Sequence, residues 1–292
     1  MMTSLSGKIA LVTGASRGIG KGIALALGEQ GATVYITGRT AAPGSSALPG
    51  SLEETAAAVN ARGGTGIAVP VDHGCDDQVA ALFARIAEEQ GRLDILVNNA
   101  FAVPAEPDKI KSFWEQPLSD WRMVDVGVRS SYVAAWHAAR MMAPKGSGLI
   151  VAISGYAGVS YTFGALFGMC KSAVDRLARD MAVELLPHGV ASVSLWQGFT
   201  FTELALAAIA KRAELQKSTV TNPAIGSSPE FPGRVIAALA SDPDVMERSG
   251  GTFITAELAQ EYAITDIDGR TIPSLREARG APIWQPVAPA GQ

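Results

Sequence analysis

Short, mostly apolar runs rich in β-branched residues alternate with longer segments of helical periodicity, from residue 8 to about residue 256. Alternation of this kind is typical of strand–helix–strand units that build a parallel sheet. Several runs are apolar at nearly every position, which indicates strands buried on both faces. The pattern predicts strands at residues 8–14, 33–38, 66–72, 93–99, 148–154, 191–197 and 251–256.

Three segments interrupt this alternation. Residues 40–51 form a Gly/Pro/Ser-rich loop, and residues 199–230 combine a helical stretch with several Pro and Gly, a composition that suits a mobile substrate lid. Residues 264–292 have little periodicity and end Pro-rich, so we expect an extension that either packs as an extended arm or is partly disordered. A chain of 292 residues with one such pattern predicts a single domain over residues 1–263, followed by this C-terminal extension.

Composition narrows the class of protein. With 48% hydrophobic and 18% charged residues and a net charge of −4, the chain predicts a well-buried globular protein without a basic surface for nucleic acid or membrane. The sequence contains neither a signal-peptide pattern nor an apolar run long enough to span a bilayer, so we expect a cytoplasmic location. Two cysteines and three well-separated histidines indicate neither a disulfide framework nor a metal site.

A glycine-rich loop follows the first predicted strand. The sequence TGASRGIG places Gly14, Gly18 and Gly20 between that strand and an amphipathic helix. Glycine permits a tight turn and lets backbone N–H groups approach a phosphate, while the N-terminus of the helix favours an anion. Because a strand precedes the loop and a helix follows it, the loop is predicted to bind a dinucleotide.

This loop is one of four features that resemble the short-chain dehydrogenase/reductase family, over about residues 6–258. The others are NNA at residues 98–100, Ser154 at the end of the fifth strand, and Lys171 in the next helix. The stretches GIALALGEQGATVYITGR, SLWQGFTFTEL and DIDGR further resemble the subgroup around the vertebrate dehydrogenase/reductase family member 1. The resemblance implies an α/β fold, a Rossmann-type doubly wound sheet of about seven parallel strands with helices on both faces, and an oxidoreductase.

The type of cofactor follows from charge. The second strand ends at Gly38 and Arg39, where a site for NAD would offer an acidic side chain to the ribose 2′-hydroxyl. Arg39, together with Arg17 in the glycine loop, suits a 2′-phosphate instead, so NADP(H) is predicted; the alternative is that both arginines are merely solvated. The loop and the resemblance together assign the cofactor contacts to Gly14, Ser16, Arg17, Gly18, Ile19, Gly20, Arg39, Asp72, Asn98, Ala100, Lys171 and Thr202.

The catalytic positions depart from the family pattern. The family places a Tyr 13 residues after its Ser and four residues before its Lys, and both spacings reach Phe167 here. The position of the family's relay Asn falls on Gly127. A positioned general acid contributes about 10² to 10⁴ in rate, so ordinary ketone reduction is expected to be impaired. Ser154, Lys171 and the cofactor loop remain.

The sequence leaves several functions open. The first is an NADP(H)-dependent reductase of a small hydrophobic carbonyl that uses another acid, Tyr161 or, behind it, Tyr156; Tyr161 is also consistent with an aromatic pocket wall. The second is hydride transfer to an imine or enone, which needs no acid at the carbonyl. The third is a degenerate NADP(H)-binding protein or a non-redox enzyme on the same scaffold. A reductase inactivated by a Tyr-to-Phe change is a further alternative.

Aromatic residues suggest the type of substrate, and long apolar helices suggest association of the chain with copies of itself. We expect a hydrophobic substrate because aromatic residues fall on strand ends and loops near the catalytic positions, namely Phe101, Phe163, Phe167, Trp196, Phe199 and Phe201. Family members pair through the two helices that here span about residues 119–142 and 165–187, so the resemblance implies a homodimer or homotetramer.

Overall fold

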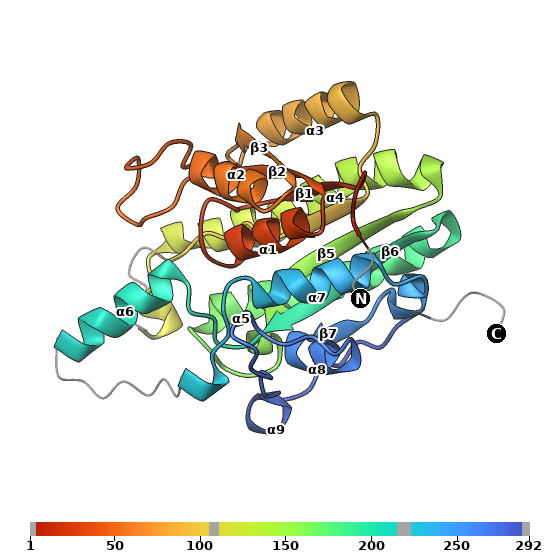
Figure 1. Cartoon of the computed structure of the whole chain (residues 1–292). Coiled ribbons are helices and arrows are strands. Elements are labelled where there is room, and N and C mark those ends of the chain that lie inside the picture. Colours follow the sequence, from red (N-terminus) through yellow and green to blue (C-terminus); the bar gives the residue numbers. More distant parts are fainter. Residues whose placement is uncertain (1–3, 105–110, 215–222, 288–292) are drawn as a thin grey trace.

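Seven parallel strands form one sheet in the order β3-β2-β1-β4-β5-β6-β7 (Figure 1). The computed structural model describes residues 4–104, 111–214 and 223–287. The strands are β1 Ile9–Val12, β2 Thr33–Gly38, β3 Thr65–Pro70, β4 Ile95–Asn98, β5 Gly148–Gly155, β6 Val190–Gln197 and β7 Thr252–Ile254. All seven predicted strands are present, and the doubly wound Rossmann-type fold is confirmed.

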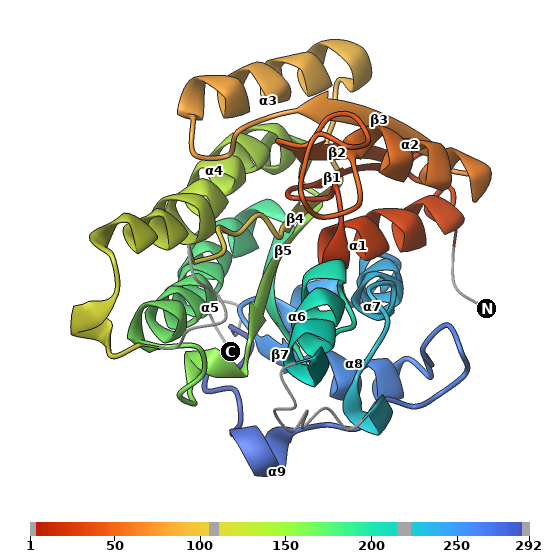
Figure 2. The same cartoon turned by 90° about the vertical axis from the view of Figure 1, so that its left-hand side faces the viewer.

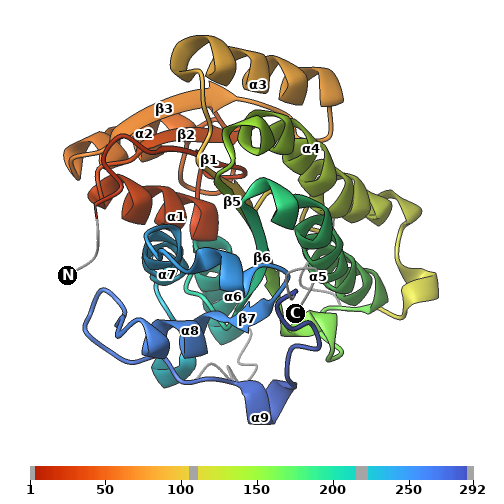
Figure 3. The same cartoon turned by 90° about the vertical axis from the view of Figure 1, so that its right-hand side faces the viewer.

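Helices cover both faces of the sheet, as Figures 2 and 3 show. Helices α1, α2 and α7 lie on one face, and α3, α4 and α5 lie on the other. The helices are α1 Gly18–Glu29, α2 Leu52–Ala61, α3 Asp76–Gln90, α4 Ser130–Met142, α5 Ala165–Leu185, α6 Glu203–Glu214, α7 Phe231–Ala240, α8 Thr255–Glu261 and α9 Arg276–Arg279. Each face therefore has its own apolar core, which is why β1, β4 and β6 are buried along their whole lengths.

Two elements differ from the sequence prediction. The seventh strand ends at Ile254, two residues early, because α8 begins at Thr255. The helix expected from about residue 119 is divided into a 3₁₀ turn at Leu118–Trp121, a π-helical stretch at Val124–Arg129 and then α4. Segments of π-helix are rare and frequently occur at functional sites, and this one contains Gly127.

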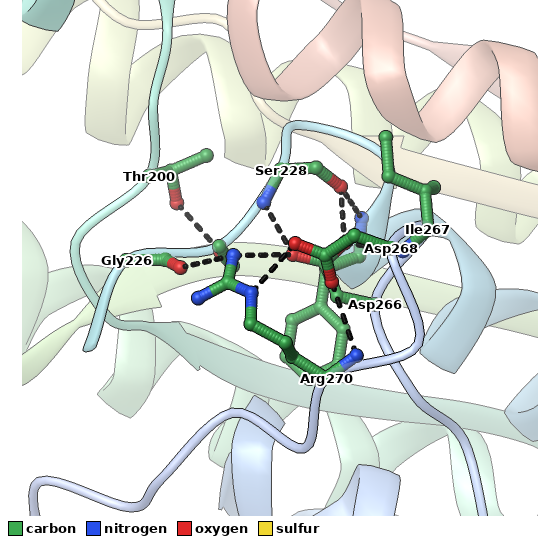
Figure 4. Close-up of polar contacts among 9 residues, drawn as sticks. Thr200, Gly226, Ser228, Asp266, Ile267, Asp268 and Arg270 are labelled. Carbon is green, nitrogen blue, oxygen red and sulfur yellow. Dashed lines mark hydrogen bonds and ion pairs between the residues drawn. The ribbon is translucent and has the colours of Figure 1, made fainter. Parts of the chain in front are cut away.

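The C-terminal extension packs against the domain as far as residue 287. Ile264, Ile272 and Val287 are buried, and the Asp266 carboxylate, only 1% exposed, accepts the N–H groups of Ser228 at 2.7 Å and Ile267 at 2.8 Å (Figure 4). Arg270 donates to the main-chain oxygen of Gly226 at 3.4 Å. Of the two alternatives for the tail, a packed arm is therefore observed for residues 264–287, and it is fastened to Gly226 and Ser228, close to the C-terminal end of the predicted lid.

Candidate active site

The strand order reverses between β1 and β4, and the predicted functional residues gather at the carboxyl ends of these strands. Gly18 has a φ of +58°, and a Cβ added at Gly20 would lie 2.4 Å from both the Asn99 amide and the Gly14 oxygen. Only glycine fits such a turn, because its backbone must approach neighbouring atoms closely. The loop thus leaves a groove of about 440 Å³ open above the N-terminus of α1, as a dinucleotide phosphate requires.

Asn99 holds the glycine loop in this shape. Its side chain donates to the main-chain oxygens of Thr13 at 2.8 Å and Gly14 at 3.0 Å. Asn98, which was expected to border the groove, is instead buried and donates to the oxygen of Ser131 on α4 at 3.1 Å. Asn99 lies in the same NNA sequence. The motif therefore indicated the segment that borders the groove, but not which of its two asparagine side chains faces the groove.

The two arginines proposed for the 2′-phosphate have different surroundings. Both line the groove, together with Ser16, Ile19, Asp72, Ala100 and Thr202. The Arg17 guanidinium donates to Pro49 O, Gly50 O and Ser46 Oγ at 2.8–3.1 Å, so it fastens the 40–51 loop over the groove. Arg39, by contrast, is exposed and has no hydrogen-bond or ion-pair partner within the described part of the chain.

A carboxylate from the predicted lid lies at the N-terminus of α1. Glu203, the first residue of α6, accepts the backbone N–H of Gly18 at 2.7 Å. A helix N-terminus attracts anions through its unpaired N–H groups and its dipole. Glu203 therefore makes the kind of contact that a cofactor phosphate would make, a feature that the sequence motifs did not reveal.

A second, largely apolar cavity of about 470 Å³ adjoins the groove. The two share Ile19, Asn99, Phe101 and Thr202. Ser154, Phe163, Phe167, Lys171 and Phe199 also line this cavity, which we call the aromatic pocket. Trp196 and Phe201, also expected there, are not among its lining residues, since Trp196 packs in the core against Tyr156.

Lys171 lies between two aromatic rings in this pocket. Its Nζ is 4.7 Å from the centre of the Phe101 ring and 5.6 Å from that of Phe167, and it donates to the oxygen of Ile153 at 3.1 Å. Removal from water lowers the pKa of Lys171 to about 8, although the charge of Asp175 opposes the shift. Ser154 donates to the oxygen of Lys171 at 3.3 Å and lines the same pocket.

Phe167 packs within a cluster of aromatic side chains. The Phe101 ring meets Phe167 edge-on at 5.4 Å, and Phe163 meets Phe167 in the same way on another side. A Cβ at Gly127 would lie 2.6 Å from the Phe101 ring. Phe101 therefore occupies space beside the backbone of residue 127, where a larger side chain does not fit. Phe167, Phe101 and Gly127 therefore belong to one packed cluster.

Neither tyrosine considered as a substitute acid has a free hydroxyl in the pocket. Tyr161 is 76% exposed and is not among the lining residues. Tyr156 does line the pocket, but its hydroxyl accepts the N–H of Leu275 at 3.1 Å. Burial raises the pKa of Tyr156. Its position suits anchoring of the C-terminal extension.

Neither a cluster of potential metal ligands nor a membrane-spanning helix occurs within the described ranges. Those residues contain no group of three or more His, Cys, Asp or Glu side chains arranged to hold a metal ion. Among the same residues, no helix has the length and apolarity needed to cross a membrane.

Comparison with known proteins places this geometry in context. The profile of the family described as short chain dehydrogenase matches residues 8–213. The mouse protein named Dehydrogenase/reductase SDR family member 1 is 42% identical over 280 residues, covering 93% of this chain and 87% of the mouse protein. The human protein of the same name is 40% identical over 283 residues, with the same coverage of 93% and 87%. At this coverage the similarity includes part of the C-terminal extension.

The same fold occurs in solved structures. The crystal structure of a short-chain type dehydrogenase/reductase from Mycobacterium marinum is 29% identical and has a TM-score of 0.73, covering 87% of this chain and 95% of that one. The resemblance drawn from the sequence motifs, at the level of both family and subgroup, is confirmed.

Proposed function

Because the chain belongs to the short-chain dehydrogenase/reductase family, whose members carry out nicotinamide-dependent oxidoreduction, we propose that it is an NADP(H)-dependent reductase of a small hydrophobic carbonyl, imine or enone. One observation carries the proposal: the nucleotide groove and the aromatic pocket share a wall made by Ile19, Asn99, Phe101 and Thr202. A dinucleotide in the groove would therefore direct its nicotinamide end toward an apolar pocket that contains Lys171 and Ser154.

Charge at the end of β2 supports NADP(H) over NAD(H). Gly38 ends the strand without a carboxylate, and the unpartnered guanidinium of Arg39 lines the groove beside it. Arg17 supplies a second positive charge while its donors hold the 40–51 loop. Guanidinium groups bind phosphate oxygens through short, charge-assisted hydrogen bonds, so this corner favours the 2′-phosphate.

Lys171 is the side chain suited to supply the missing proton. NADPH, when bound, supplies the hydride, and the product of carbonyl reduction needs one proton on oxygen. The Lys171 ammonium lines the pocket, and its pKa of about 8 lies close to physiological pH, as that of an effective general acid should. We infer that it donates this proton and regains one from water, while the Ser154 hydroxyl helps to hold the substrate oxygen.

Imines and enones are compatible with the same site. An iminium carbon that accepts hydride yields a neutral amine directly, and an enone takes its last proton at carbon, so neither needs an acid at a carbonyl oxygen. The rings of Phe101, Phe163, Phe167 and Phe199 provide apolar walls for either.

A degenerate NADP(H)-binding protein is the second candidate. It is favoured by the phenylalanine at position 167, where the family pattern predicts the proton-donating phenol. This candidate predicts cofactor binding without turnover on any hydride acceptor, as does a reductase inactivated by a Tyr-to-Phe change.

The experiment that tests the proposal has two parts. Calorimetry with NADPH and NADH should give tighter binding of NADPH, and NADPH consumption should be measured with ketones, cyclic imines and enones between pH 6 and 10. Because the acid must be protonated, ketone turnover should be retained below a pH of about 8 and lost above it, following the Lys171 pKa. The exposed Tyr161 serves as the control, since Tyr161→Phe should leave the rates unchanged.

The outcomes separate the candidates. NADPH binding without consumption on the whole panel would establish the non-redox candidate. Turnover of ketones with no loss at alkaline pH would remove Lys171 as the acid, and a dependence on Tyr161 would return that residue to the mechanism.

A further inference from the structure

The C-terminal extension forms part of the wall of the aromatic pocket. Leu275 and Arg279, both from the extension, are among its lining residues. They lie about 120 residues along the chain from Ser154. Helix α9, which ends at Arg279, projects from the body of the molecule (Figure 1). The extension thus supplies two side chains to the pocket wall, in addition to covering the domain.

The segment that bears Arg279 is held in place by several contacts. The Leu275 N–H donates to the Tyr156 hydroxyl at 3.1 Å, and the Arg276 guanidinium pairs with both carboxylate oxygens of Glu257 on α8. Ser274 also donates to Glu257, at 2.6 Å. Gly280 has a φ of +103°, and a Cβ there would lie 2.9 Å from Val159, so the chain after α9 packs closely against Val159.

The guanidinium of Arg279 is not paired with any described residue. Its side chain is exposed, and within the ranges that the structure describes its guanidinium has no hydrogen-bond or ion-pair partner. Arg276, three residues earlier on the same helix, is fully engaged by Glu257. The extension therefore neutralises one of its two neighbouring guanidinium groups and leaves the other at the pocket.

The charges around the pocket have one sign. Among the described residues that line it, the charged side chains are Lys171 and Arg279, both cations, and no carboxylate is present. The buried amide nitrogen of Gln197, another lining residue, has no hydrogen-bond partner among the described residues. Cations and an unpaired donor on otherwise apolar walls disfavour a cationic ligand and favour one with a negatively charged oxygen group.

We propose that Arg279 is a specificity-determining residue that binds an anionic group, in the first instance a carboxylate, at one end of a hydrophobic carbonyl substrate. A planar guanidinium binds a carboxylate through two parallel charge-assisted hydrogen bonds. The aromatic rings would hold the apolar body of the substrate while Lys171 and Ser154 face its reactive carbonyl. This inference rests on the proposed function, since it assigns the substrate class of the same pocket.

The test measures binding to the complex with NADP⁺, so that no turnover intervenes. The probes are 4-oxo-4-phenylbutanoate and its methyl ester, which share the aromatic ketone and differ in the negative charge. In the unaltered protein the acid should bind about three- to tenfold more tightly than the ester, and the difference should shrink with added salt. Arg279→Gln should weaken binding of the acid but not of the ester, so that the two probes bind with similar affinity. Arg279→Lys should restore part of the preference for the acid.

The control removes a positive charge elsewhere. Lys145→Gln changes net charge equally, but Lys145 follows α4 at the opposite end of the sheet, so the preference for the acid should remain. An unchanged preference in Arg279→Gln, or equal weakening of acid and ester, overturns the role of Arg279. If NADP⁺ itself does not bind, the proposed function fails, and the inference fails with it. If NADP⁺ binds and acid and ester bind equally well to the unaltered protein, only the inference fails.

Discussion

At the scale of single residues, the aromatic cluster around Lys171 decides the chemistry. Phe167 lies at the position where the family pattern predicts a tyrosine, and Phe101 fills the space beside Gly127. Together these side chains form a packed pocket around a lysine of lowered pKa. Lys171 is therefore a cation that can give up its proton near neutral pH and that lines the pocket.

Restoring the phenol should restore ordinary ketone reduction. Phe167→Tyr places a hydroxyl on the ring whose centre lies 5.6 Å from the Lys171 ammonium, so the lysine can lower the pKa of the new phenol. We expect NADPH-dependent ketone turnover to rise by about 10², the lower end for a general acid, because Gly127 still lacks the relay side chain.

The matched variant is Phe163→Tyr, which adds the same hydroxyl to a neighbouring ring of the pocket. Its turnover should stay close to that of the unaltered protein. Equal rates in both variants would show that position 167 has no special relation to the substrate carbonyl.

At the scale of elements, α6 and the C-terminal extension supply part of the walls of the two cavities. Helix α6 begins with the carboxylate that contacts Gly18, and Thr202, just before it, lies between groove and pocket. The extension is fastened through Asp266 to Ser228, close to the C-terminal end of the predicted lid (Figure 4). The part of that lid at residues 215–222 lies outside the described residues.

Removing the charge of Glu203 should tighten cofactor binding. The carboxylate contacts the helix N-terminus where phosphates bind, and it repels them. Glu203→Ala should lower the Kd for NADPH about threefold to tenfold, as measured by calorimetry at low ionic strength. The control is Glu88→Gln on the exposed side of α3, with no expected change. Weaker NADPH binding in Glu203→Ala would instead mean that Glu203 helps to form the groove.

At the scale of the whole molecule, one face remains open to association. Helices α4 and α5 border a groove of about 720 Å³, where Tyr132 is 53% and Trp136 is 47% exposed. Val183 on α5 is 55% exposed. Unpaired apolar surface on two adjacent helices supports the prediction of a homodimer or homotetramer that packs through this face.

A charge at this face should dissociate the assembly. Sedimentation of the unaltered protein should give a dimer or tetramer, and Trp136→Glu should shift it toward monomer because a carboxylate would be buried without a partner. Trp114→Glu, at an aromatic residue that is 73% exposed but lies outside these helices, should leave the assembly unchanged. A monomer in all three proteins would refute a homo-oligomer built on α4 and α5.

The sequence alone determined the fold and the position of the site. Runs of apolar residues are local patterns, and so is a glycine loop between a strand and a helix, so β1 to β7 and the cradle at Gly14, Gly18 and Gly20 could be predicted from neighbouring residues. Two fixed spacings located Phe167, because residues four apart share one face of a helix.

The tertiary structure alone decided which distant side chains meet. Glu203 reaches Gly18, and Phe101 occupies the space beside Gly127. Arg279 and Ser154 line the same pocket. It also showed that the side chain of Asn99, and not that of Asn98, holds the glycine loop, and it placed Tyr161 outside the pocket. These outcomes depend on packing between segments far apart in the chain, for which a local pattern carries no signal, because only the folded sheet brings their strand ends and loops together.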